Sequence, residues 1–282
     1  MKKLVLLFVL FFFTSIFGQN NISAGEKAIC EERLEFSVKK ELGNSSLNDI
    51  IITIAQEFIG VEYEAGTLDQ NESEELVVHL SGLDCYTLVD NSLALARSVK
   101  FGDASFENYL KELENIRYRD GKLDGYISRL HYVTDWIYDL GNRGILLDVT
   151  EKIGGEKYSK TINFMSENSD KYVHLKDNSE NISRIKSVEE IINSRANYYV
   201  PQDRIAEVES KIESGDIIAL TTSIKGLDIV HVGYAMRQDD GKIHFLHAPN
   251  VGYKVQITKK PLSEYVKGNK SQTGIMVFRA AE

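Results

Sequence analysis

A β-hairpin signal in the C-terminal third constrains the fold of this chain more than any other feature. Two strand-like runs, 229–236 and 242–248, are joined by the short polar segment 238–241, Gln-Asp-Asp-Gly, which is typical of a tight turn. A tight turn of this kind joins antiparallel strands, so we expect an antiparallel sheet around it. Further strands are predicted at 144–150, 217–220, 255–257 and 274–278.

The chain before these strands carries helical patterns. Apolar residues recur at helical spacing in 24–40, 47–59 and 102–123, and a shorter helix is expected at 202–212. Helices come first and antiparallel strands follow. This order predicts an α+β fold, with N-terminal helices packed on an antiparallel sheet, rather than repeating strand-helix-strand units.

A cysteine opens another predicted helix. Leu88, Leu93 and Ala96 form an apolar stripe behind Cys85, and Asp84 is placed to cap the start of the helix. The free N–H groups and partial positive charge of a helix start stabilise a thiolate and can hold an oxyanion. Cys85 is therefore predicted to be a nucleophile. The alternative is that it is a small buried apolar residue.

The hairpin is expected to bring two histidines together. With Gly241 in the left-handed position of a three-residue loop, Gly233 faces His247 across the hairpin, and His231 becomes the diagonal neighbour on the same side. Diagonal neighbours lie roughly 7–8 Å apart, which two imidazoles can bridge. His244 has the opposite parity and should point to the other face.

A cysteine nucleophile needs a base within hydrogen-bonding reach and a third group that orients the base. His231 and His247 can supply both, and with Cys85 they form the candidate catalytic set. A solvent-exposed pair of histidines is the plainer alternative. No metal is predicted, because one cysteine and two histidines lack the close ligand spacing of zinc motifs.

The segment 128–138 is dense in side chains that can bind a ligand. On a helix, His131 and Asp135 would lie four residues apart on one face, with Arg129 and Trp136 close by. Two interpretations stay open. These residues contact a substrate, or His131 and Asp135 form a structural hydrogen bond beside a buried tryptophan.

The first 18 residues are typical of a secretory signal peptide, since Lys2 and Lys3 precede an uncharged apolar run at 4–13. That run is too short for a membrane span of about 20 residues, and no later segment approaches this length. The mature protein is predicted to be soluble and exported, periplasmic or otherwise secreted. In such a compartment, a disulfide between Cys30 and Cys85 is an alternative that would silence the nucleophile.

The charge of the chain excludes one class of partner. It carries 42 acidic and 33 basic residues, a net charge of −9 at pH 7, and has no long basic run. This balance argues against binding to nucleic acid or to an anionic membrane through a cationic face.

Four short motifs occur in a fixed order along the chain: Asp84-Cys85 at a helix start, Gly215-Asp216 before a strand, His231-Val232-Gly233, and His247-Ala248 after the hairpin. This order resembles the NlpC-type, papain-like cell-wall cysteine peptidases. More closely, the N-acetylmuramoyl-L-alanine amidase-like branch is similar at 66–68 (Gly-Thr-Leu), 82–87 (Gly-Leu-Asp-Cys-Tyr-Thr) and 128–136.

The resemblance implies a domain organisation and roles for the site residues. It implies a papain-like catalytic domain at 46–282 with a helical insertion at about 102–195, preceded by the signal peptide at 1–18 and a helical segment at 19–45. By this resemblance, Cys85 is the nucleophile, His231 the base and His247 the orienting group. Tyr63 lies near the thiolate. The substrate is recognised by Arg129, His131, Asp135 and Trp136. The sequence departs from the branch at Tyr86, which stands where a small hydroxyl residue is usual.

The activity implied is that of a secreted cysteine amidase, which hydrolyses the N-acetylmuramoyl-L-alanine amide bond in peptidoglycan fragments. Its partner would be a muropeptide, and no cofactor is required. Two alternatives remain: an endopeptidase that cuts between D-glutamate and diaminopimelate, and a non-catalytic protein that binds muropeptides. The oligomeric state is not predicted.

Overall fold

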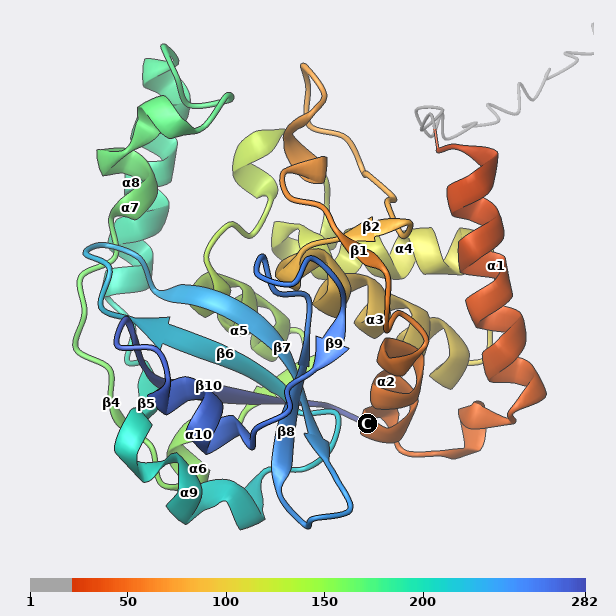
Figure 1. Cartoon of the computed structure of the whole chain (residues 1–282). Coiled ribbons are helices and arrows are strands. Elements are labelled where there is room, and N and C mark those ends of the chain that lie inside the picture. Colours follow the sequence, from red (N-terminus) through yellow and green to blue (C-terminus); the bar gives the residue numbers. More distant parts are fainter. Residues whose placement is uncertain (1–21) are drawn as a thin grey trace, which may run out of the picture.

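The computed structural model describes residues 22–282, and the signal peptide predicted at 1–18 lies outside this range. The longer N-terminal helices cover one face of a central sheet, and short helices close the other (Figure 1). The combination of helices with an antiparallel sheet confirms the predicted α+β class. Every helix between residues 22 and 282 falls short of the length and apolar character that a membrane crossing would need.

The N-terminal half is mainly helical, as predicted. The helices expected at 24–40 and 47–59 are present, and the one expected at 102–123 is shorter because Ser105 caps its start, with Oγ accepting from Asn108 N–H at 3.2 Å. The longer helices are α1 (Ala24–Lys39), α2 (Leu47–Gln56), α3 (Cys85–Lys100), α4 (Phe106–Arg117), α5 (Val133–Asn142) and α8 (Ser179–Asn193). The short helices are α6 (Thr150–Ile153), α7 (Phe164–Glu167), α9 (Ile205–Val208) and α10 (Leu262–Lys267).

The main sheet has eight strands in the order β4-β5-β10-β6-β7-β8-β9, with β3 attached to β10, and all its pairs are antiparallel. The strands predicted from the sequence are present with shifted ends. The bounds are β3 (Leu146–Asp148), β4 (Glu156–Lys157), β5 (Tyr198–Pro201), β6 (Ile217–Thr222), β7 (Ile229–Arg237), β8 (Ile243–His247), β9 (Gln256–Ile257) and β10 (Gln272–Ala280). A separate parallel pair joins β1 (Glu62–Tyr63) to β2 (Gly82–Leu83).

The hairpin between β7 and β8 has the predicted register. Arg237 pairs with Ile243 and Tyr234 pairs with Leu246, as a three-residue loop requires. Gly241 has φ +77°, the left-handed conformation that glycine adopts without strain. The prediction of the loop type is therefore confirmed.

The prediction of one helix at 202–212 is wrong in detail, because this stretch forms three short helical turns, of which only α9 is α-helical. Arg237 accounts for the break near its end. Its guanidinium donates to the carbonyls of Glu209, at 3.2 Å, and Ile212, at 2.7 Å. A side chain from the sheet thus takes the carbonyls that a longer helix would use.

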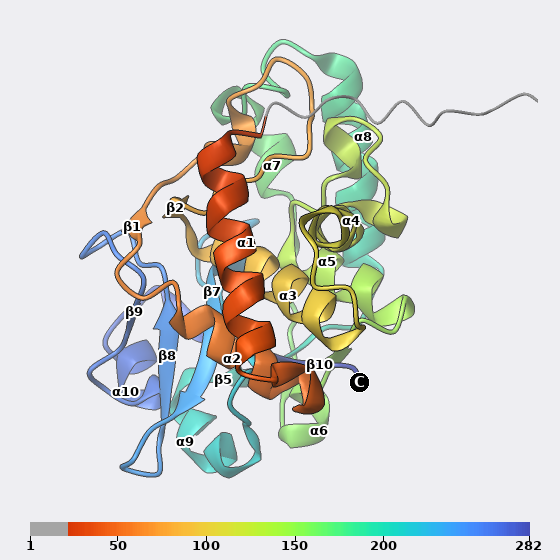
Figure 2. The ribbon, with the colours of Figure 1, turned by 90° about the vertical axis from the view of Figure 1, so that its right-hand side faces the viewer.

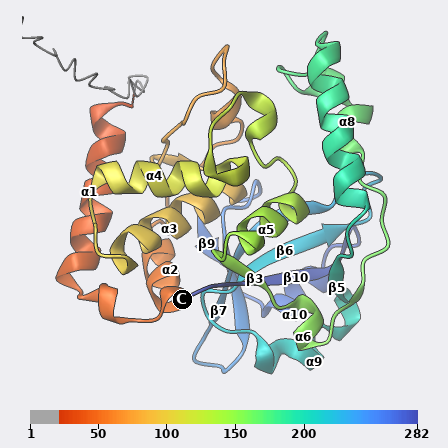
Figure 3. The same ribbon diagram turned by 180° about the vertical axis from the view of Figure 1, so that it is seen from behind.

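Both faces of the sheet are buried. Along β6, Ile217 and Ala219 belong to one apolar cluster, and Ile218 and Leu220 belong to another, since successive residues of a strand point to opposite faces. The first cluster is completed by α1 to α5, seen from the side and from behind in Figures 2 and 3. The second is closed by α6, α9 and α10.

A third, smaller apolar cluster joins 126–132 to α7 and α8, at the end of the sheet away from α1 (Figure 1). It lies within the range 102–195 that was expected to be an insertion. The other part of that range, α4 and α5, contributes instead to the main core beside α3.

Candidate active site

Cys85 is the first residue of α3, and local hydrogen bonds hold it there. Thr87 N–H donates to Asp84 Oδ1 at 2.8 Å, and Asp84 N–H donates to Thr87 Oγ1 at 2.9 Å. This reciprocal pair is a capping box, which satisfies two backbone donors of the helix start. The prediction that Asp84 caps the helix is confirmed. Behind the cap, Leu88 and Leu93 are fully buried and orient the helix.

Two backbone segments place Tyr63 beside Cys85. Tyr63 pairs with Leu83 in the β1–β2 ladder, and Glu64 N–H donates to the Leu83 carbonyl at 3.2 Å. Burial raises the pKa of Tyr63 to about 12, and the neighbouring Cys85 and Asp84 add to the effect. The tyrosine therefore stays neutral next to the thiol.

The two histidines of the hairpin are in direct contact. Nε2 of His231 lies 2.7 Å from Nδ1 of His247. Glycine is required at position 233, because a Cβ there would lie 2.9 Å from the His247 Cβ and 2.5 Å from the Leu246 carbonyl oxygen. His244 points to the other face, where its Nδ1–H donates to the Thr258 carbonyl at 2.7 Å. The geometry predicted for the three histidines is confirmed.

Desolvation keeps the histidine pair uncharged at neutral pH. Burial lowers the pKa of His231 to about 4 and that of His247 to about 3, and the charge of His231 lowers the latter further. His247 stacks on Phe245, with ring centroids 4.7 Å apart, and meets Tyr265 edge-on at 5.3 Å. A neutral imidazole in this position can accept a proton.

The sulfur of Cys85 lies against several backbone donors. The pKa of its thiol is raised to about 12, mainly by burial and also by Asp84, against the opposing effect of the N–H groups of Val232, Cys85 and Tyr86. Val232 follows His231 on β7, so Cys85 and the candidate base come from two elements that pack on each other, α3 and β7. The N–H groups at the start of α3 are donors of the kind that hold an oxyanion.

A cleft of about 630 Å³ contains the candidate catalytic groups. No described residue that lines it is Asp or Glu, whereas Lys259 and Lys260 both line it. This part of an otherwise acidic protein is therefore cationic. The cleft is lined by Tyr63, Cys85, Val230, His231, His247, Pro249, Asn250, Val251, Gln256, Thr258, Lys259, Lys260, Tyr265, Asn269 and Gln272.

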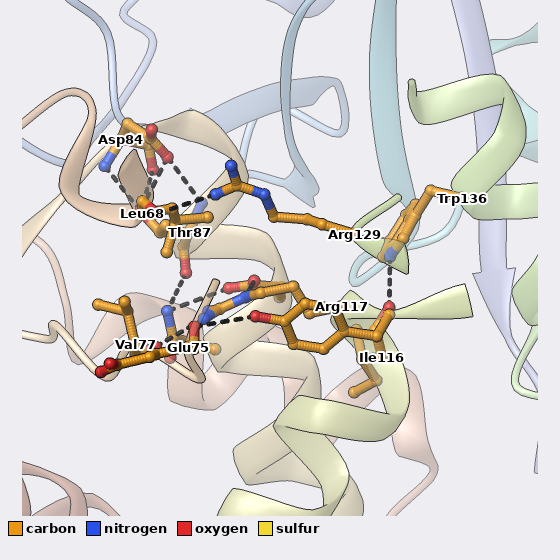
Figure 4. A network of polar contacts seen from close by, with 12 residues as sticks. Leu68, Glu75, Val77, Asp84, Thr87, Ile116, Arg117, Arg129 and Trp136 are labelled. Carbon is orange, nitrogen blue, oxygen red and sulfur yellow. Dashed lines mark hydrogen bonds and ion pairs between the residues drawn. The ribbon is translucent and has the colours of Figure 1, made fainter. Parts of the chain in front are cut away.

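A smaller cavity of about 180 Å³ lies on the other side of the same helix start, since Asp84 and Tyr86 line it. Arg129, only 5% exposed, reaches into it and donates to the Leu68 carbonyl at 3.1 Å and to the carboxylate of Asp69 (Figure 4).

His131 also lines the small cavity. Its Nε2–H donates to the Tyr126 carbonyl at 2.8 Å, and burial lowers its pKa well below the ordinary value. Both Arg129 and His131 thus line a cavity together with Asp84 and Tyr86, the two neighbours of Cys85 in the chain.

The prediction that His131 and Asp135 share a helical face is wrong, because α5 begins only at Val133 and His131 precedes it. Asp135 is 1% exposed and pairs with Arg119 at 2.5 Å and with Arg195 at 2.7 Å. The charges of two arginines fix the position of this carboxylate in the interior.

Trp136 is buried too. Its Nε1–H donates to the Ile116 carbonyl at 3.0 Å (Figure 4). Its ring meets Tyr86 edge-on, with centroids 6.1 Å apart. Neither Asp135 nor Trp136 lines the two cavities described above, although Trp136 supports Tyr86, which does.

Both cysteines are free, so the alternative disulfide is not formed. Cys30 is fully buried among apolar side chains of the main core, whereas Cys85 is partly exposed. Among residues 22–282, no cluster of three or more His, Cys, Asp and Glu side chains is arranged to hold a metal ion.

Three residues near the site escaped the sequence analysis: Glu26, Lys259 and Lys260. Glu26 lies on α1 and accepts hydrogen bonds from Leu80 and Ser81, more than fifty positions later in the chain. No local pattern signals such a contact. The adjacent lysines follow β9, and in the sequence they have the pattern of ordinary surface residues. Only the fold shows that they line the cleft.

Comparisons with known proteins identify the family of the chain. A family model described as AmiA-like, N-acetylmuramoyl-L-alanine amidase-like, matches residues 53–275. A structure of an N-acetylmuramoyl-L-alanine amidase from Bacteroides uniformis is 35% identical, with a TM-score of 0.80 over 84% of this chain and 100% of that one. A comparison with curated proteins finds no match.

Two further structures are similar. A Bacteroides fragilis protein, named as a candidate xylanase, is 37% identical, with a TM-score of 0.77 over 81% of this chain and 99% of that one. A Legionella pneumophila protein shares the fold, with a TM-score of 0.67 at 23% identity over 91% of this chain and 97% of that one.

Proposed function

This chain belongs to the AmiA-like family of N-acetylmuramoyl-L-alanine amidase-like proteins, and on that premise we propose that it is a cysteine amidase acting on peptidoglycan fragments. The bond it hydrolyses is the amide between N-acetylmuramic acid and L-alanine. One observation carries the proposal: Cys85, at the start of α3, lines the same cleft as the hydrogen-bonded His231 and His247.

The resting state proposed is a neutral thiol beside a neutral imidazole, in keeping with the raised pKa of Cys85 and the lowered pKa of His231. With its proton on Nε2, His231 donates to Nδ1 of His247 and keeps Nδ1 free as an acceptor. His247 thereby orients the base, as the third member of such a set must.

The reaction then follows in two stages. His231 takes the proton of Cys85 as the sulfur attacks the muramoyl carbonyl, and the N–H groups of Cys85 and Tyr86 hold the oxyanion. The proton passes from His231 to the departing amine of L-alanine, and the C–N bond breaks. Water, deprotonated by His231, hydrolyses the thioester and returns the enzyme to its resting state. No cofactor takes part.

The small cavity is proposed to receive the sugar, and the cleft the peptide. Arg129 and His131 are the substrate contacts on the sugar side. Asp135 and Trp136 do not contact the substrate but support the wall of the small cavity, since both are buried and Trp136 packs on Tyr86. Tyr63, with its pKa raised to about 12, presents a neutral hydroxyl close to the reacting thiol.

The fold and location complete the proposal. We propose that the core is papain-like and NlpC-type, and the packing of α3 on an antiparallel sheet that carries both histidines supports this. We place the catalytic domain at 46–282, with an insertion at about 102–195, after a helical segment at 19–45. A signal peptide at 1–18 would direct the protein to the periplasm or outside the cell.

The test is incubation of freshly reduced wild-type and Cys85→Ala protein with N-acetylmuramoyl-L-alanyl-D-glutamyl-diaminopimelate, followed by mass spectrometry. The amidase releases the intact tripeptide together with N-acetylmuramic acid, and Cys85→Ala releases neither. Release of free diaminopimelate would identify an endopeptidase instead. Absence of any cleavage by wild type would indicate a protein that only binds muropeptides.

A further inference from the structure

A carboxylate from α1 holds the segment that leads into Cys85. Glu26 is only 8% exposed. Its Oε2 accepts from the backbone N–H groups of Leu80, at 2.5 Å, and Ser81, at 3.2 Å, and its Oε1 accepts from the Ser81 hydroxyl at 2.5 Å. Hydrogen bonds to a charged acceptor are about twice as strong as neutral ones, so three of them make a firm anchor.

Little chain separates this anchor from the nucleophile. Only 82–84 lie between Ser81 and Cys85. Within them, Leu83 is paired with Tyr63 in the β1–β2 ladder. A displacement of the anchored end therefore passes directly to the start of α3.

A histidine ties the same anchor to β1. Nδ1 of His79 lies 3.4 Å from Glu26 Oε1, and its Nε2 lies 2.8 Å from Glu64 Oε2. The Glu64 carboxylate lies over Gly82, where a Cβ would come within 2.4 Å of it. Glu26, His79 and Glu64 thus form one connected layer over the approach to the nucleophile.

We infer that Glu26 is a positioning residue for Cys85, which makes α1 a working part of the active site. The inference rests on the proposed function. It adds a residue that lies outside 53–275, the range matched by the family model. Figure 2 shows α1 running alongside α2 and α3, with its N-terminal end toward β2.

The reason for catalysis to depend on this anchor is geometric. The N–H groups of Cys85 and Tyr86 must stay aligned with Val232 on β7 to face the same sulfur and oxyanion. A misplacement of roughly 1 Å can cost about 10²-fold in rate. Three hydrogen bonds at the entrance to α3 prevent such a shift.

The experiment compares wild type with Glu26→Gln, Glu26→Ala and Ser81→Ala. Glu31→Gln is the matched control, since Glu31 lies on α1 with its side chain 56% exposed. Three quantities are measured for each: kcat and KM for the muramyl tripeptide, the rate of Cys85 alkylation by iodoacetamide located by mass spectrometry, and the midpoint of thermal unfolding.

We expect kcat to fall roughly 10-fold in Glu26→Gln and further in Glu26→Ala, with KM changed less than about twofold. Alkylation of Cys85 slows in the same order, and Glu31→Gln matches wild type. Wild-type kcat and alkylation in all folded Glu26 and Ser81 variants, with only the unfolding midpoint lowered, would overturn the inference. If Glu26→Ala does not fold, Glu26→Gln and Ser81→Ala decide. Alkylation that slows in a protein whose wild type cleaves nothing would uphold the positioning role and reject the amidase.

Discussion

The two cavities that meet at the start of α3 differ in how their charges are arranged. The cleft beside Cys85 holds Lys259 and Lys260 and, among the described residues that line it, no carboxylate. The small cavity holds Arg129 already paired with Asp69.

This difference separates two tasks. Unpaired cations attract an anionic ligand, and the stem peptide of a muropeptide carries carboxylates. Charges that are already paired offer directed hydrogen bonds without net attraction, which suits a neutral, hydroxyl-rich sugar. The proposed chemistry belongs to the cleft, because Cys85 and both histidines line it.

The largest effect is expected from removing the base on the cleft side. Substitution His231→Ala should lower kcat by about 10³-fold, the usual contribution of general acid–base catalysis, with little change in KM. The measurement is steady-state hydrolysis of the muramyl tripeptide. His244→Ala is the control, because His244 points to the opposite face of the sheet. Equal losses in the two variants would show that the loss is structural.

In the small cavity, loss of Arg129 should lower the stability of the protein as well as weaken binding of the sugar. Arg129→Met removes the partner of Glu74, whose side chain is 2% exposed and whose pKa burial already raises. Breaking a buried ion pair in this way is expected to lower the free energy of unfolding by about 3 kcal/mol. Urea titration measures it, with Arg184→Met on the exposed face of α8 as the control. A loss below about 1 kcal/mol would mean that Arg129 is held loosely.

The pH dependence of kcat/KM tests whether His231 is desolvated in the cleft. The pKa of His231 is lowered from 6.5 to about 4. Above pH 4 the imidazole is neutral and can act as a base, and this ability is lost as the pH falls through 4. We therefore expect kcat/KM to hold as the pH falls below 6.5 and to decline only toward about 4. Circular dichroism at each pH confirms that the protein stays folded. A decline centred near 6.5 would point to a hydrated histidine.

The smallest effect concerns the two lysines. The double variant Lys259→Gln/Lys260→Gln should raise KM by roughly fivefold for N-acetylmuramoyl-L-alanyl-D-glutamate, since exposed ion pairs contribute about 0.2–1 kcal/mol each. With D-isoglutamine in place of D-glutamate, the α-carboxylate is amidated and only the γ-carboxylate stays charged, so KM should rise less. Lys254→Gln is the control, because Lys254 pairs with Glu62 at 2.9 Å and does not line the cleft. An unchanged KM for both substrates would break the proposed contrast between the cavities.

Features governed by neighbours in the chain were predictable. Asp84 as a cap and Gly241 in the hairpin loop depend on backbone geometry within a few residues, and both are as expected. The contact between His231 and His247 followed from the loop type, because a hairpin loop sets the register of the whole ladder.

Features that depend on distant segments were not predictable. His131 and Asp135 have helical spacing, but α5 starts after His131, and Asp135 is drawn inward by Arg119 and Arg195. Glu26 carries no sign in the sequence of its role at the nucleophile segment. In each case the partner comes from a segment whose position is set by packing.

The sequence by itself determined the α+β class, the capped cysteine and the histidine pair, because short-range backbone geometry and side-chain parity act within one helix or one hairpin. Only the tertiary structure decided that Cys85 lines the same cleft as that pair, that the two cavities differ in charge, and that Glu26 of α1 binds the segment before Cys85. Those contacts form when buried apolar faces bring α1, α3 and β7 together, and the burial of both sheet faces selects that arrangement from many that the local patterns allow.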